Sequence, residues 1–421
     1  MKHRLLLAVL LMGACCAAAQ QVPVRPDALP SVPEVFSTKS IQMATSVEQM
    51  ASWNRYPTYE TYVAMMQQWE QQYPELCTLD TIGLSVNGRL ILSMHIEGNR
   101  DLDLYRPEFF YSSTIHGDEV TGYVMMLRLI DTLLSGYGHN QQYTDLVNEV
   151  AIYINPLANP DGTYRGGNST VQGAVRENAN GVDLNRNYPD PFAVSKATLQ
   201  LENEAMIDYV SGHQFRLSAN LHGGSEVMNY PWDCFTSSVR PHPESTWWKA
   251  VCKRFVDTSR VYSNSHFRGV NSQGYIAGGD WYVIHGGRQD YMNYYHDCLE
   301  LTMEISTRKT LDAENLPEYW RFLQHSLVNY IAEIQALPGG QNGVDSPGQG
   351  VPSLAVYPNP AADRVLLKGL ADGATVLLCD MTGRVVARHC YVKGSPIDLS
   401  ALPSGLYLLR ADGATARVVK R

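Results

Sequence analysis

The 421-residue sequence predicts an α/β domain with helices on both faces of a sheet, followed by a small all-β sandwich domain. Two observations predict this architecture. Apolar strand patterns alternate with amphipathic helix patterns over residues 55–337, which is typical of an α/β sheet. After a stretch rich in Gly, Pro and Ser at residues 338–353, short alternating patterns separated by turn residues cover residues 354–421.

The individual elements follow from local patterns of apolar residues. The expected strands of the first domain lie at residues 88–98, 108–117, 149–156, 216–223 and 298–306. The expected helices lie at residues 120–134, 244–257 and 317–337. Residues 20–54, which are rich in Pro and Ser over much of their length, are interpreted as a leader, and residues 338–353 as a flexible linker.

The overall composition excludes several classes of protein. Hydrophobic residues make up 44% of the chain, which suffices for a sizeable core and excludes global disorder. The formal charge is −9 and no long basic run occurs, so nucleic acid is not expected as a partner. No apolar run reaches the roughly 18–20 residues that a transmembrane helix needs.

The N-terminus predicts export. Basic residues 2–4 precede an apolar run at residues 5–12, and three alanines at residues 17–19 form a small-residue cleavage site. This pattern is typical of a signal peptide, here residues 1–19. A first core helix and a lipoprotein signal at Cys15 are the alternatives. Six further cysteines leave the disulfide pairing open, and the lack of a CxxC pair disfavours a thiolate metal site.

Two segments carry candidate metal ligands. His116 and Glu119 lie three residues apart where a strand leads into a helix, so both can face one metal ion. His222 closes an apolar strand before two glycines, a place where α/β sheets build their sites. Two imidazoles and one carboxylate leave a fourth position open, as catalytic zinc requires. Taken alone, His116 is better explained as an ordinary core or surface histidine.

Two further segments carry charged residues in unusual settings. The adjacent Asn185 and Arg186 could clamp a carboxylate, although an isolated Arg more often forms a surface ion pair. Strand alternation places Glu300, Thr302 and Glu304 on one face of an otherwise apolar strand. A carboxylate in a buried strand is costly unless it is paired, protonated or functional.

In this order, the four segments resemble the zinc metallocarboxypeptidases of the carboxypeptidase A/B superfamily. The resemblance covers roughly residues 55–335, and residues 181–190, 217–233 and 286–306 look like the N/E, or regulatory, branch. It implies a mixed, mostly parallel sheet and one zinc ion per chain. It also implies the following ligands: His116, Glu119 and His222.

The resemblance implies the remaining roles position by position. Glu304 is the general base that takes a proton from water and returns it to the leaving amine, and Arg176 polarises the scissile carbonyl. Asn185 and Arg186 hold the terminal carboxylate of the substrate, which confines the enzyme to chain ends. Tyr282, 22 residues before Glu304, matches the tyrosine that closes over the substrate.

Specificity is also implied by the regulatory branch. Gln289 matches the residue at the floor of the side-chain pocket, and Asp233 matches the acidic residue of that pocket. An acidic pocket favours Lys or Arg by charge pairing. The resemblance therefore implies release of C-terminal Arg or Lys from peptides or proteins. Alternatively, Asp233 is a turn residue.

Three features depart from the family. Asp118 stands where the branch usually has Asn, so an added carboxylate lies beside the metal and could alter its affinity. The segment before residue 55 is too short for the prodomain of the digestive enzymes. The transthyretin-like domain expected directly after the catalytic domain is replaced by the linker and a different β module.

The last module resembles the C-terminal sorting domain of type IX secretion. The resemblance rests on residues 357–361, 380–386 and 402–407 and on the basic end at Lys420 and Arg421. It implies the type IX secretion machinery as a partner, with a secreted or cell-surface location reached through the periplasm and outer membrane. An ordinary β-sandwich or a transthyretin-like domain is the alternative.

The sequence thus predicts a monomeric, exported zinc carboxypeptidase that acts on peptide or protein C-termini. Two other functions stay open. One is a zinc amidase or deacylase on the same fold, against which Asp233 and Gln289 argue. The other is a non-catalytic surface binding protein, against which the intact candidate ligands, Arg176 and Glu304 argue.

Overall fold

A computed structural model describes most of the chain. It covers residues 41–100, 106–190, 198–338, 355–357, 361–368, 370, 372–380, 385–411 and 414–421. The expected signal peptide, the leader up to residue 40 and nearly all of the expected linker lie outside the described residues.

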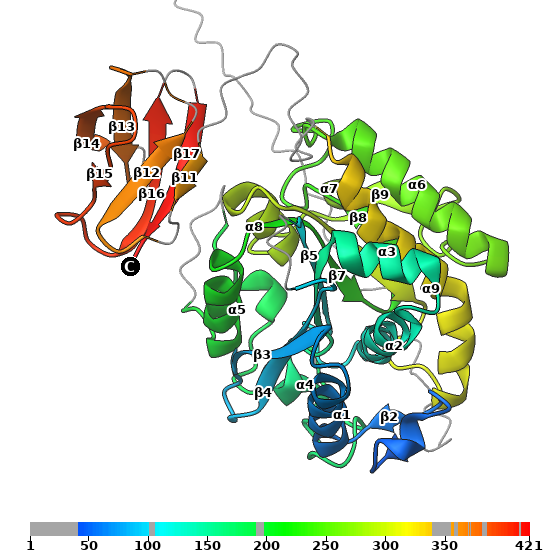
Figure 1. Cartoon of the computed structure of the whole chain (residues 1–421). Coiled ribbons are helices and arrows are strands. Elements are labelled where there is room, and N and C mark those ends of the chain that lie inside the picture. The colour runs from blue at the N-terminus through cyan, green and yellow to red at the C-terminus, as the bar shows by residue number, and fades with distance from the viewer. Residues whose placement is uncertain are drawn as a thin grey trace, which may run out of the picture.

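A mixed eight-stranded sheet forms the centre of the first domain (Figure 1). Its strands are β3 (Cys77–Leu84), β4 (Leu90–Ile96), β5 (Glu108–Ser113), β6 (Ala151–Asn155), β7 (Phe215–His222), β8 (Ser225–Tyr230), β9 (Tyr275–Ala277) and β10 (Leu299–Ser306). Their order is β3-β4-β6-β5-β7-β10-β8-β9. The central run β6-β5-β7-β10 and the pair β8-β9 are parallel, whereas β3-β4, β4-β6 and β10-β8 are antiparallel. The expected mixed, mostly parallel sheet is confirmed.

Helices cover both faces of this sheet (Figure 1). They are α1 (Tyr59–Gln72), α2 (Thr121–Gly136), α3 (Gln141–Glu149), α4 (Pro160–Thr163), α5 (Leu201–Ser211), α6 (Ser245–Tyr262), α7 (Gly278–Trp281), α8 (Arg288–Tyr295) and α9 (Leu316–Ala332). The helices α1, α2, α6 and α9 contribute to the larger hydrophobic core, and α5 and α8 to a second core on the other face. Within the described residues, no helix is both long enough and apolar enough to cross a membrane.

Alternation along β7 shows how one strand serves both faces. Leu217, Ala219 and Leu221 point into the larger core and are fully buried. The intervening Asn220 and His222 therefore point to the opposite face of the sheet. That face carries polar side chains near the carboxyl ends of the parallel strands, where α/β sheets form their sites.

Several expected elements have different ends in the structure. The strand expected at 108–117 ends at Ser113, so His116 lies in the turn before α2. The helix expected at 244–257 spans Ser245–Tyr262, and Ser259 extends its buried face beyond residue 257. The helix expected at 317–337 is α9 followed by a 3-10 turn over Glu333–Ala336.

The packed domain also begins earlier than residue 55. Within the expected leader, β1 (Met43–Ala44) pairs with β2 (Tyr56–Pro57). Ala44 and Met50 are buried in the larger core. Residues 41–54 therefore pack against the first domain, because their apolar side chains cover one side of that core.

The C-terminal module is all-β, as expected. One sheet contains β11 (Ala355–Tyr357), β12 (Arg364–Lys368) and β15 (Ile397–Asp398). The other contains β14 (Val385–Cys390), β13 (Thr375–Cys379), β16 (Gly405–Ala411) and β17 (Ala414–Lys420). Val365, Val376, Leu409 and Val418 from the two sheets share one core. All six cysteines of the described residues are free thiols.

Candidate active site

Three buried side chains converge at the carboxyl ends of the central strands. The turn after β5 supplies His116 and Glu119, and the last residue of β7 supplies His222. The Nδ1 atom of His222 lies 2.8 Å from Glu119 Oε2 and 3.0 Å from His116 Nδ1. One ligand atom from each residue lies within 4.8 Å of the others. Two imidazole nitrogens and a carboxylate oxygen fit a zinc ion, and this group is the only such cluster among the described residues.

Asp183 contacts the ring nitrogen of His116 that does not face Glu119. Its Oδ1 atom lies 3.2 Å from His116 Nε2, so the Nδ1 atom faces Glu119 and His222. A carboxylate in this position orients a ligating imidazole. The sequence reasoning missed Asp183, although it lies two residues before Asn185 in the segment that carried the resemblance.

Arg176 joins the same cluster. Its Nε and Nη2 atoms bind Asp183 Oδ2 at 2.9 and 2.8 Å. Its Nη1 atom lies 3.1 Å from His116 Nδ1 and 3.5 Å from Glu119 Oε1. The guanidinium is therefore in contact with two of the three candidate metal ligands.

Burial favours the metal-binding form of His222 in this cluster, whereas for His116 the charge of Glu119 and the hydrogen bond to Asp183 outweigh burial and raise the pKa. Burial lowers the pKa of His222 to about 4, so its imidazole is neutral at physiological pH. Burial raises the pKa of Asp183, but the hydrogen bond to His116 and the charges of His116 and Arg176 outweigh this and hold it well below the usual range. A neutral imidazole is the form that binds a metal ion.

The unusual carboxylate of Asp118 is paired. Lys309 Nζ lies 2.8 Å from Asp118 Oδ2 and 3.6 Å from Glu119 Oε1. Thr310 Oγ1 also donates to the Asp118 carbonyl, so the loop after β10 is tied to the metal turn. Lys309 therefore balances the charge that Asp118 adds beside the candidate ligands.

Glu304 lies on the same face as His222. The two residues are direct neighbours in the parallel pairing of β10 with β7. On β10, Met303 and Ile305 belong to the larger core, so Glu304 points to the opposite face. Glu304 is only 8% exposed, and the strand register places it beside His222, where a general base would have to lie.

The residues expected to clamp a terminal carboxylate sit in a short 3-10 turn, Leu184–Arg186. Asn185 Oδ1 accepts a hydrogen bond from the backbone N–H of Arg288, which anchors it to α8. Arg186 Nη1 donates to the Asn185 carbonyl at 2.8 Å. Tyr282 follows α7. Burial lowers the pKa of Arg176, but the nearby Asp183 carboxylate, with a smaller contribution from Tyr282, outweighs burial and raises it.

The two expected pocket residues contact each other directly. Gln289 Nε2 donates to Asp233 Oδ1 at 2.9 Å, and Gln289 Oε1 accepts from the backbone N–H of Thr302 at 2.7 Å. Asp290, which the sequence reasoning missed, accepts from the backbone N–H of Asp233 and of Cys234, both at 2.9 Å. Burial and the neighbouring Asp290 raise the pKa of Asp233 well above its usual value.

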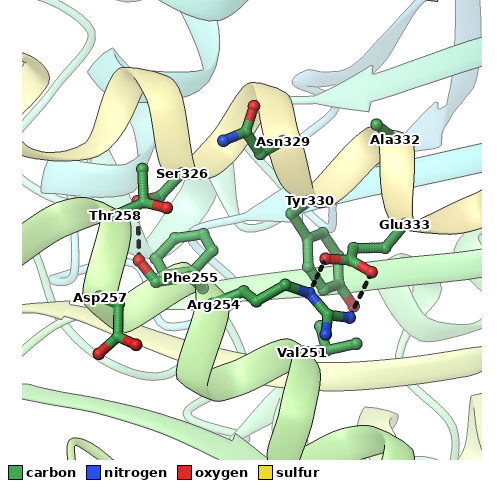
Figure 2. Close-up of a pocket in the computed structure, with 10 residues that line it drawn as sticks. All are labelled: Val251, Arg254, Phe255, Asp257, Thr258, Ser326, Asn329, Tyr330, Ala332 and Glu333. Atoms are coloured by element: carbon green, nitrogen blue, oxygen red, sulfur yellow. Dashed lines mark hydrogen bonds and ion pairs between the residues drawn. The ribbon is translucent and has the colours of Figure 1, made fainter.

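A separate surface groove lies between α6 and α9, with a volume of about 420 Å³ (Figure 2). Its main charged contact joins Arg254 and Glu333 through two hydrogen bonds of 2.7 Å, drawn in Figure 2. None of the candidate catalytic or pocket residues lines it.

Two family profiles match the chain. One, described as zinc carboxypeptidase, matches residues 62–325. The other, described as a secretion system C-terminal sorting domain, matches residues 355–421.

Curated relatives are carboxypeptidases. Carboxypeptidase D of Anas platyrhynchos is 31% identical over 324 residues, which is 74% of this chain but 23% of that protein. Carboxypeptidase M of Mus musculus is 32% identical over 72% of this chain and 70% of its own length. The catalytic chain of carboxypeptidase N of Homo sapiens is 31% identical over 66% of this chain and 69% of its own length.

Solved structures share the fold. Thrombin activatable fibrinolysis inhibitor aligns with a TM-score of 0.59 at 16% identity, over 67% of this chain and 75% of that one. Carboxypeptidase A from Helicoverpa armigera aligns with a TM-score of 0.55 at 20% identity, over 69% of this chain and 77% of that one.

Proposed function

Because this chain belongs to the zinc carboxypeptidase family, a family of metallopeptidases, we propose that it releases C-terminal Arg or Lys from peptides and proteins. The observation that carries the specificity is the buried carboxylate of Asp233, held by Gln289 on the face that bears Glu304. A buried carboxylate whose side-chain hydrogen bonds come from neutral amides favours a basic group as its ligand.

The metal is held by His116, Glu119 and His222, with His116 oriented by Asp183. When bound there, zinc supplies Lewis acidity and lowers the pKa of water toward about 7. The convergence of their ligand atoms supports this assignment, because three protein ligands leave a position open for substrate or water.

Glu304 and Arg176 act on the scissile peptide bond. Glu304 takes a proton from the attacking water and passes it to the departing amine. Arg176 donates N–H groups to the carbonyl oxygen as negative charge develops on it, an effect commonly worth about 3 kcal/mol for a well-placed donor. Asp183 fixes the guanidinium through two hydrogen bonds, so its orientation is set before substrate arrives.

Asn185, Arg186 and Tyr282 confine the reaction to chain ends. Asn185 and Arg186 bind the terminal carboxylate, which an internal peptide bond does not offer. Tyr282 closes over the bound residue from its loop after α7.

The test uses peptides that differ only in their last residue, which is Arg, Lys, Phe or Glu. The purified protein is incubated with each peptide, with and without a zinc chelator, and mass spectrometry reports loss of that residue. Chelator-sensitive loss of Arg or Lys is expected. Loss of Phe instead would keep the zinc mechanism and discard Asp233 as the selector. If zinc binds but no peptide is cleaved, the carboxypeptidase function is rejected in favour of the amidase or the binding-protein function.

We also propose that residues 354–421 direct the protein through the type IX secretion pathway, after residues 1–19 direct it to the periplasm. The match to a sorting domain supports this proposal. Deleting residues 354–421 is expected to trap an active enzyme in the periplasm. Normal export of the shortened chain would contradict the proposal.

A further inference from the structure

Asp118, which stands where the regulatory branch usually has Asn, binds a lysine beside the candidate metal ligands. Its Oδ2 atom accepts a hydrogen bond from Lys309 Nζ at 2.8 Å. Its Oδ1 atom is buried and has no hydrogen-bond partner among the described residues. Within the part of the chain that the structure describes, Lys309 is therefore the only side chain that binds the Asp118 carboxylate.

The same ammonium lies close to a candidate metal ligand. Lys309 Nζ is 3.6 Å from Glu119 Oε1. The Glu119 side chain is 4% exposed, whereas the Asp118 side chain is 22% exposed. Buried charge pairs are screened less by solvent and salt than exposed ones. Without Asp118, the carboxylate of Glu119 would therefore be a strong partner within reach of the ammonium.

Contacts other than the ion pair keep Lys309 in this place. The backbone N–H of Val120 donates to the Lys309 carbonyl at 2.9 Å. The stem of the lysine passes Gly224, where an added Cβ atom would lie 3.3 Å from Lys309 Cγ. The loop after β10 should therefore stay against the start of α2 when the charge of Asp118 is removed, and the ammonium should stay within reach of Glu119.

Glu119 has little capacity for another cation besides a metal ion. Its Oε1 atom already lies 3.5 Å from Arg176 Nη1, and its Oε2 atom lies 2.8 Å from His222 Nδ1. A carboxylate binds zinc through an oxygen lone pair. An ammonium in a close ion pair with Glu119 would occupy such a lone pair and would also repel a dication. Lys309 is therefore a potential competitor of the metal for this ligand.

Resting on the proposed metal site, we propose that Asp118 is a positioning residue for zinc binding, which holds Lys309 away from Glu119 and so keeps that carboxylate available as a ligand. Asp118 and Lys309 together carry no net charge, so the intact pair changes the charge beside the ligands little. Losing Asp118 alone leaves a cation next to Glu119, whereas losing Lys309 alone does not.

The test measures the zinc affinity of the full chain by competition with a chromophoric chelator. Asp118→Asn keeps the shape of the side chain but releases the ammonium, so the affinity is expected to fall about tenfold, as when other groups that support a metal ligand are lost. Lys309→Met removes the competing cation, so its affinity should equal or exceed that of the wild type. In the Lys309→Met background, Asp118→Asn should cost much less than tenfold, because no ammonium remains to be released.

Two simpler roles of the ion pair give different results. If Asp118 acted only through its own charge, Asp118→Asn would cost the same factor with and without Lys309. If the pair only tied two segments together, Lys309→Met would weaken zinc binding as much as Asp118→Asn. Either result, or an unchanged affinity in Asp118→Asn, would overturn the inference and leave the metal site intact. A wild-type chain that bound no zinc would overturn the metal site and this inference with it.

Asp312→Asn is the matched control, because it removes a carboxylate charge from the same loop after β10, where Asp312 pairs with Arg308 at 3.4 Å. Its zinc affinity should equal that of the wild type, and a loss as large as that of Asp118→Asn would contradict the proposal. Thermal unfolding of the metal-free variants checks that each is folded. If Asp118→Asn does not fold, Lys309→Met and Lys309→Gln decide, since weaker zinc binding in both would overturn the inference.

Discussion

Arg288 Nε donates to both carboxylate oxygens of Glu300, at 3.1 and 3.2 Å, and neither side chain is exposed to solvent. Ser218 Oγ donates to the same carboxylate at 2.8 Å, and the guanidinium lies 4.9 Å from the centre of the Phe110 ring. Glu300 is thus the buried strand carboxylate that requires a partner, and Arg288 provides it. Because the backbone N–H of Arg288 also binds Asn185 Oδ1, this ion pair anchors the start of α8 beside the clamp.

Breaking this ion pair should destabilise the first domain. Glu300→Gln leaves the Arg288 charge buried without its counter-charge, so the free energy of unfolding is expected to fall by about 3–5 kcal/mol. The double variant Arg288→Met with Glu300→Gln should lose clearly less, because no unpaired charge remains. Denaturation by urea, followed by tryptophan fluorescence, measures both. The control is Arg254→Met, which breaks an ion pair whose arginine side chain is 54% exposed and should cost at most about 1 kcal/mol. Similar losses for Glu300→Gln and the control would contradict the prediction.

Removing Asp183 should weaken metal binding. In Asp183→Ala, His116 loses the partner of its Nε2 atom and is free to turn. We expect the zinc affinity to fall about 10–100-fold, measured by competition with a chromophoric chelator. Asp312→Ala, at a partly exposed position in an ion pair with Arg308, serves as the control. Unchanged zinc affinity in Asp183→Ala would show that His116 does not need this carboxylate.

Replacing Glu304 should separate metal binding from turnover. Glu304→Gln keeps the size of the side chain but cannot accept the proton from water, so kcat should fall by at least about 10²–10⁴-fold. Zinc content, measured by atomic emission, should stay at the wild-type level because Glu304 is not in the ligand group. Unimpaired hydrolysis would remove Glu304 from the mechanism.

Replacing Asp233 should change specificity more than rate. Asp233→Ala removes the negative charge of the pocket, so kcat/KM should fall much more for peptides ending in Arg or Lys than for peptides ending in Phe. Equal losses on all three would mean that Asp233 has only a structural role.

The pKa of Asp233 predicts a pH-dependent KM. Burial, with Asp290 nearby, raises this pKa, so at low pH the carboxyl is neutral and binds a cation weakly. As the pH rises through the raised pKa, the KM for an Arg peptide should fall relative to that for a Phe peptide. Taking the ratio of these two KM values removes the effect of ionisations that change catalysis of both peptides equally. Asp233→Asn should give a flat ratio, and a flat ratio in the wild type would contradict the prediction.

Local periodicity was enough to predict the α/β class and the all-β module. The residues of the metal group were predicted from short ordered motifs and the family that these motifs resemble. His116 and Glu119 share one turn and His222 ends one strand, and the resemblance of these segments to the family implied their common role. The element ends were less certain, since the last turn of a helix such as α6 depends on what its apolar face meets.

Which distant residues touch is set by the way the chain folds. The contact of Asp183 with His116, the pairing of Arg288 with Glu300 and the register that aligns Asn220 with Thr302 all join separate segments of the chain. Strand order and register set such contacts, and a one-residue slip would turn each side chain to the other face of the sheet. These contacts are therefore properties of the folded chain, because each joins residues from two different segments.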